Sequence, residues 1–97
     1  MCSYIVQKAD IYGSGKGATG WFSVTQANVC MDHPFHANLD DALLIDFVNP
    51  GMGVAARVAV ELSAESARAL VTAIEAALAE GHDHGIVPAA AVVSVGS

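Results

Sequence analysis

The sequence predicts an α+β fold, in which an antiparallel sheet of about four strands carries one C-terminal helix packed on one face. Two observations predict this fold. Four segments rich in β-branched and apolar residues come first along the chain, and a single segment with helical periodicity follows them. The connections between the strand segments are short, which favours antiparallel neighbours with the helix on one face of the sheet.

The first half of the chain predicts a hairpin. Residues 3–12 are β-branched and aromatic and indicate a strand. Residues 13–20 are rich in glycine, and we expect a hairpin loop with several positive-φ positions there. The second strand is expected from Trp21 to about Met31.

Two further strands follow a loop at residues 33–41, which Pro34 opens. The dense apolar run 42–48 indicates a central strand, and residues 54–62 indicate the fourth. Between them, Asn49-Pro50-Gly51-Met52-Gly53 predicts a type II turn.

Helical periodicity is clearest after Ser63, which we expect to cap the helix, with Gly81 just past its end. An apolar stripe at 3.6-residue spacing consists of Ala67, Leu70, Val71, Ile74, Ala77 and Leu78. A polar break at 82–85 follows, and residues 86–95 indicate a weak edge strand or a frayed end. We therefore expect one α+β domain over residues 1–81 and a C-terminal tail over residues 82–97.

The composition favours self-association. Hydrophobic residues make up 54% of the chain and charged residues only 14%, whereas globular chains average about 25% charged residues. Both faces of the expected sheet are largely apolar, and one helix covers only one of them. We therefore expect a homodimer that hides the surplus apolar surface.

The charge excludes some partners. The net charge is −6, and the only fixed cations, Lys8, Lys16, Arg57 and Arg68, are scattered along the chain. Nucleic acid and anionic membrane surfaces are therefore not expected as partners. The sequence shows no secretory signal and no apolar run of about 20 residues, so we expect a cytoplasmic protein with reduced thiols.

One short segment, Cys30-Met31-Asp32-His33-Pro34-Phe35-His36, gathers residue types that bind transition metals. Because Pro34 ends the strand, a turn can bring His33 and His36 to one side, with Cys30 or Asp32 as a third ligand. His82 or His84 is a candidate fourth ligand. Zinc is the expected ion. The alternative is structural: the histidines bond to the loop backbone and Cys30 is a small buried hydrophobe.

Other residues point to a ligand site. Asp46 and Arg57 interrupt the apolar runs of the last two strands and are expected to lie nearly opposite each other. They form either a structural ion pair, or a pocket in which Asp46 is a catalytic acid or base and Arg57 orients an anion. Lys16 in the glycine-rich segment and Trp21 directly after it are further candidates for ligand binding. The glycine-rich segment is not a Walker loop, because Gly17 rather than serine or threonine follows Lys16.

Several motifs together resemble a small family of uncharacterised actinobacterial proteins of unknown function. The resemblance covers about residues 1–80 and rests on Gly13-Ser14-Gly15-Lys16-Gly17 with Gly20-Trp21-Phe22, Asp32-His33-Pro34-Phe35-His36-Ala37, Ile45-Asp46-Phe47 with Asn49-Pro50, and Val60-Glu61-Leu62-Ser63-Ala64-Glu65-Ser66-Ala67-Arg68-Ala69-Leu70. It implies a free-standing bacterial protein encoded near specialised-metabolite genes, and it carries over no catalytic residue.

Two functions from different classes follow. The first is a small cytoplasmic metal-binding protein, either a metal-dependent enzyme or an accessory protein of specialised metabolism. The second needs no metal: a homodimer that binds a small molecule in an apolar pocket between sheet and helix, anchored by Arg57 or Lys16, or that is purely structural. The sequence does not decide whether the chain is an enzyme.

Overall fold

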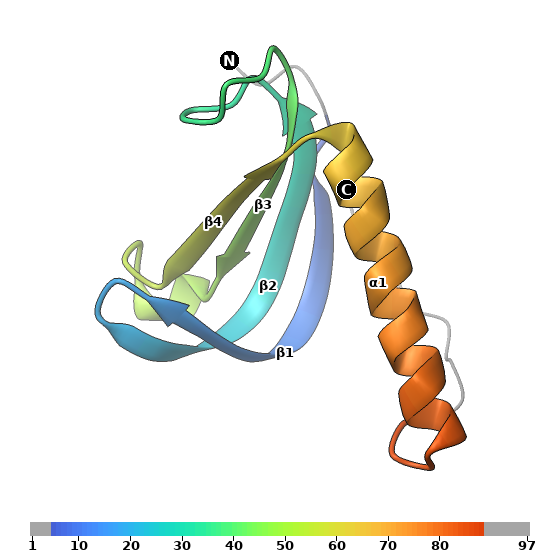
Figure 1. Cartoon of the computed structure of the whole chain (residues 1–97). Helices are drawn as coiled ribbons and strands as arrows, with labels where there is room; N and C mark the ends of the chain where they lie inside the picture. The colour runs from blue at the N-terminus through green and yellow to red at the C-terminus, as the bar shows by residue number, and fades with distance from the viewer. Residues whose placement is uncertain (1–4, 89–97) are drawn as a thin grey trace.

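The predicted α+β fold is confirmed: a four-stranded antiparallel sheet is followed by one helix (Figure 1). The computed structural model describes residues 5–88. The strands pair in chain order, so each strand pairs with the one before it. The regular elements are the strands β1 (Gln7–Gly17), β2 (Gly20–Asp32), β3 (Ala42–Val48) and β4 (Arg57–Leu62), the short 3₁₀ helix η1 (Pro50–Met52), and the helix α1 (Ala64–Asp83).

The predicted glycine-rich loop is wrong for most of its length, because β1 continues to Gly17 and only residues 18 and 19 turn. The glycines serve packing. A Cβ on Gly15 would lie 2.9 Å from Cγ2 of Val24, and one on Gly17 would lie 3.3 Å from Cε1 of Phe22. Without those atoms the backbone of β1 closes over these two side chains.

The sheet is strongly curled. The register between β1 and β2 shifts between Asp10 and Gly13, where β1 has a bulge or irregularity, and beyond it β1 bends far enough to contact β4. Figure 1 shows this hairpin curving toward the start of β4. The small core lies inside the curl, where Phe47 and Val58 pack against the buried residues Phe22, Val24 and Ala56.

The strands β3 and β4 are antiparallel neighbours, as predicted. Leu43, Ile45 and Phe47 pair with Leu62, Val60 and Val58, while Leu44, Asp46 and Val48 pair with Glu61, Ala59 and Arg57. We call the face with Phe47 and Val58 the concave face, and the face with Asp46, Arg57 and Glu61 the outer face.

The turn before β4 differs from the prediction. Residues 50–52 form η1, and β4 begins at Arg57 rather than Val54. The side chain of Asn49 explains the difference: its Oδ1 accepts a hydrogen bond from the backbone N–H of Gly51, and its Nδ2 donates to the carbonyl of Ser23. Asn49 therefore ties the turn to β2 and caps the short helix.

Ser63 caps α1 as predicted, because its hydroxyl accepts a hydrogen bond from the N–H of Ser66. The helix runs through Gly81 to Asp83, so the first half of the predicted polar break, residues 82 and 83, belongs to its last turn. Gly81 is buried under the residues that follow the helix, and a Cβ there would lie 2.6 Å from Cγ2 of Val87. Residues 86–88 have no regular structure, and residues 89–95 of the expected tail strand lie outside the described residues.

The helix packs on β3 and β4, and its lower half extends beyond the sheet in Figure 1. The predicted stripe is therefore poorly covered, with Leu70, Val71, Ile74 and Leu78 between 42% and 55% exposed. Within residues 5–88, no helix combines the length and the hydropathy needed to cross a bilayer.

Candidate functional site

The loop at residues 33–41 is held on the outer face of β4 by one carboxylate. Glu61 Oε2 accepts a hydrogen bond of 2.6 Å from the N–H of Phe35. Its Oε1 accepts bonds of 3.0 Å from the N–H of His36 and 2.8 Å from the N–H of Ala37. Three consecutive backbone donors thus surround one side chain, and the chain between β2 and β3 cannot swing away without breaking all three bonds.

The environment of Glu61 favours its charged form. The hydrogen bonds from the backbone of Ala37 and Phe35 lower the pKa of Glu61 below its usual value, and the bond from His36 acts in the same direction. Glu61 is therefore a carboxylate at neutral pH, and the loop is fixed whenever this anion is present.

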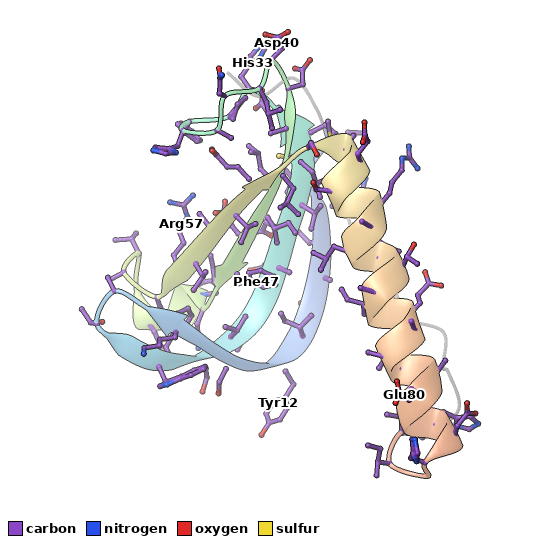
Figure 2. All side chains as sticks on the ribbon, viewed as in Figure 1. Tyr12, His33, Asp40, Phe47, Arg57 and Glu80 are labelled. Atoms are coloured by element: carbon purple, nitrogen blue, oxygen red, sulfur yellow. The ribbon has the colours of Figure 1, made fainter. Side chains whose placement is uncertain are left out.

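A groove of about 520 Å³ lies between this loop and the outer face of β4. Among the described residues, its lining consists of Phe35, His36, Ala37, Arg57, Ala59 and Glu61. Figure 2 shows the side chain of Arg57 on the side of β4 toward which the loop bends. The groove thus combines an aromatic ring, an imidazole, a guanidinium and a carboxylate whose oxygens accept three backbone hydrogen bonds.

The guanidinium of Arg57 is held in place by Asp46. Nε of Arg57 donates a hydrogen bond of 2.9 Å to Oδ1 of Asp46, and Nη2 lies 2.7 Å from the same oxygen. The two residues lie two positions apart along the strands, because Asp46 pairs with Ala59 and Arg57 pairs with Val48. The predicted ion pair is present, and it orients Arg57 beside the groove.

His33 fixes the other end of the loop. Its Nδ1 lies 3.0 Å from the carbonyl oxygen of Asp40 and 3.5 Å from Oδ1 of Asp41. The bond to the Asp40 carbonyl and the charge of Asp41 raise the pKa of His33 above its usual value. The backbone N–H of His33 also donates to Oδ1 of Asp32 at 2.7 Å.

The four residues predicted as metal ligands lie in different surroundings. Cys30 and Asp32 pair with Leu44 and Ala42 at the end of β2, His33 lies against residues 40 and 41, and His36 lines the groove. In the part of the chain that the structure describes, no three histidine, cysteine, aspartate or glutamate side chains are grouped as a metal ion requires. His82, one of the two candidates for a fourth ligand, has its Nδ1 3.0 Å from the carbonyl of Val87.

The structure therefore gathers three predicted site residues at one place, with His36 and Arg57 in the groove and Asp46 behind Arg57. Lys16 and Trp21 lie elsewhere, as a cross-strand pair in the hairpin of β1 and β2. Arg57 was expected in a pocket between the sheet and the helix. It lines the groove beneath the 33–41 loop instead.

Sequence reasoning missed Glu61 and Phe35 as site residues. A signal for Glu61 was present, because it is an acidic residue inside the apolar run of the fourth strand. A carboxylate in such a run needs donors, and the neighbouring loop supplies them as backbone N–H groups, which carry no sequence signature.

Comparison with known proteins gives a family and no function. No curated protein and no solved structure matches the chain significantly. A family model matches residues 1–87, nearly the whole described part of the chain. The chain therefore belongs to a family of unknown function, DUF6295.

Proposed function

We propose that this chain is a small-molecule-binding protein whose ligand occupies the groove between the 33–41 loop and β4. The ligand class is a small molecule with an anionic group, such as a carboxylate, next to an aromatic or apolar part. One observation carries the proposal: the Glu61 clamp on the N–H groups of residues 35–37 holds Phe35 and His36 beside the guanidinium of Arg57.

Arg57 supports the anionic part of the ligand class. Its side chain is half-exposed, and both of its contacts to Asp46 go to a single oxygen. A guanidinium carries five N–H donors, so others remain for a bound anion. A planar fork of this kind suits a carboxylate, which it can bind through two parallel hydrogen bonds.

Phe35 supports the aromatic part. The residue is 90% exposed, although its backbone is fixed by the 2.6 Å bond to Glu61. An exposed ring on a fixed backbone can stack on a planar ligand with little loss of backbone freedom. The methyl groups of Ala37 and Ala59 line the same groove, whose 520 Å³ falls within the roughly 300–1,000 Å³ of ligand pockets.

The test is a matched pair of probes. We expect an aromatic carboxylate, such as 2-naphthoate, to bind the full chain in isothermal titration or ligand-observed NMR, and the corresponding neutral amide to bind more weakly. Arg57→Ala should weaken the carboxylate roughly tenfold, the low end for a hydrogen bond to a charged group, because the site is half-exposed.

Arg68→Ala is the matched control, because it removes the same cation from the exposed side of α1 and should leave the affinity unchanged. If the carboxylate and the amide bind equally, or if both arginine variants behave alike, the groove is not an anion-binding site and the proposal is wrong.

The resemblance to actinobacterial proteins supports a finer version, in which this binding protein serves as an accessory to specialised metabolism in a bacterial cytoplasm. The metal site predicted from Cys30, Asp32, His33 and His36 is a separate hypothesis. It is tested by elemental analysis of the purified chain, before and after incubation with zinc.

A further inference from the structure

The fold leaves two apolar surfaces poorly covered in one chain. The first is the helix stripe, defined by Leu70, Val71, Ile74 and Leu78, each between 42% and 55% exposed. The second is an open groove of about 230 Å³ on the concave face, lined by Ile11, Gly13, Ser14, Val24, Phe47 and Val58.

The chain's own helix does not cover that groove. Only Ser63 separates β4 from α1, and the helix contacts β3 and β4 before it extends past the sheet. Among the described residues, no helix residue lines the groove. Within residues 5–88 of a single copy, the stripe and the groove are therefore both open.

The described part of the chain leaves many large apolar residues exposed. Among residues 5–88, thirteen large apolar residues are at least 37% exposed, the four of the stripe and Ile11 of the groove among them. A standard protein interface buries only about 800 Å² per partner. Few apolar residues are buried in the described chain: they are Phe22, Val24, Ala27, Ala42 and Ala56.

We infer that the partner is a second copy of this chain, with the helix stripe of each copy packed on the concave face of the other. One chain supplies both a protruding apolar ridge and an open apolar groove, so a two-fold pairing buries both at once. The stripe carries no charged residue, since Arg68, Glu75 and Glu80 fall outside it. The helix side of the interface therefore brings no charge of its own, although each copy carries a net charge of −6.

The test is the molar mass of the full chain by sedimentation equilibrium, with two matched pairs of variants. The unmodified chain should have twice 9.9 kDa. Ile74→Asp on the stripe should reduce the mass to that of one chain, while Ala76→Asp, two residues along the same helix and off the stripe, should leave the dimer intact.

The second pair tests the sheet side. Ile11 lines the concave groove, whereas the fully exposed Tyr12 points away from the sheet in Figure 2. Ile11→Asp should break the dimer and Tyr12→Asp should not. If Ile74→Asp fails to fold, Ile74→Ser takes its place, and a folded Ile74→Ser chain that keeps the dimer mass would overturn the inference.

Two further results would overturn the inference. A monomeric mass for the unmodified chain would mean that another part of the chain, or a different partner, covers the stripe. A dimer broken by Ile74→Asp but kept by Ile11→Asp would mean that the two stripes pack on each other and leave the concave face open.

Discussion

Glu61 is the residue on which the candidate site depends, because its carboxylate accepts hydrogen bonds from the N–H groups of Phe35, His36 and Ala37. Glu61→Gln keeps the size but removes the charge and turns one acceptor into a donor that opposes these N–H groups. We expect hydrogen exchange at residues 35–37 to accelerate toward the rate of unprotected amides, while the exchange of β2 and β3 amides is unchanged.

Glu75→Gln is the control for this change. It removes the same charge at a position that is exposed on α1. Equal exchange at residues 35–37 in Glu61→Gln and in the unmodified chain would show that the loop is held by other contacts.

The stability of the 33–41 loop should depend on pH, because the pKa values of Glu61 and His33 are shifted in opposite directions. The pKa of Glu61 is lowered by its backbone donors, so its contribution to stability is present above the unfolded value of 4.5 and is lost as the pH falls through the lower folded value. The pKa of His33 is raised by the Asp40 carbonyl and by Asp41, so its contribution is full below 6.5 and is lost as the pH rises through the higher folded value.

We therefore expect the loop to be most firmly held between pH 4.5 and pH 6.5, where both contributions are fully present. Hydrogen exchange at residues 35–37, corrected for intrinsic rates, should show greatest protection near pH 5.5. In His33→Ala the loss of protection on the alkaline side should disappear while the loss on the acid side remains. Protection that rises steadily up to pH 8 would contradict the assigned role of His33.

Gly15 and Gly13 test why the hairpin is rich in glycine. A Cβ on Gly15 would lie 2.9 Å from Cγ2 of the buried Val24, whereas one on Gly13 would meet nothing within 4 Å. Gly15→Ala should lower the free energy of unfolding by about 1–3 kcal/mol through overpacking. Gly13→Ala should be neutral or raise it by up to about 1 kcal/mol, because alanine restricts the unfolded chain. Urea denaturation measures both, and equal effects would mean that packing does not explain the glycines.

At the scale of elements, hydrophobic pattern and local signals predicted most of the fold. The third strand was predicted with its observed bounds, residues 42–48, because a dense apolar run between two turn signals leaves little choice of limits. The start of the helix was predicted for a similar reason, since the hydroxyl of Ser63 can satisfy a free N–H group at a helix start.

The errors arose where distant packing outweighs a local signal. Gly15 and Gly17 suggested a loop but belong to a strand, because Phe22 and Val24 need the space that their missing side chains leave. Gly81 suggested a helix end but lies inside the helix, because Val87 packs against it. Such contacts depend on partners that the local sequence does not identify.

The candidate site was predictable only in part, for the same reason. Asp46 and Arg57 were found because charges inside apolar strands are conspicuous and strand register brings them together. His36 was found because of its residue type, although its observed place is the groove. The Glu61 clamp depends on backbone N–H groups of a loop whose fold no pattern specified.

At the scale of the whole molecule, the two proposals concern opposite surfaces. The ligand groove lies on the outer face, beneath the 33–41 loop, whereas the dimer contact uses the concave face and the helix stripe. Variants at Ile11 and Ile74 therefore test assembly without altering the groove, and variants at Arg57 test ligand binding without altering the stripe. A failure of one proposal can be told from a failure of the other.

The most direct measurement of the central claim is a ¹H–¹⁵N NMR titration of the full chain with the aromatic carboxylate. If the groove is the ligand site, the largest shift changes should fall on the amides of residues 35–37 and on the Nε–H of Arg57. In Arg57→Ala the amide changes should need a roughly tenfold higher carboxylate concentration, while Arg68→Ala should leave the titration unchanged. Changes centred on Lys16 and Trp21, or spread evenly over the molecule, would contradict the claim that this groove binds the ligand.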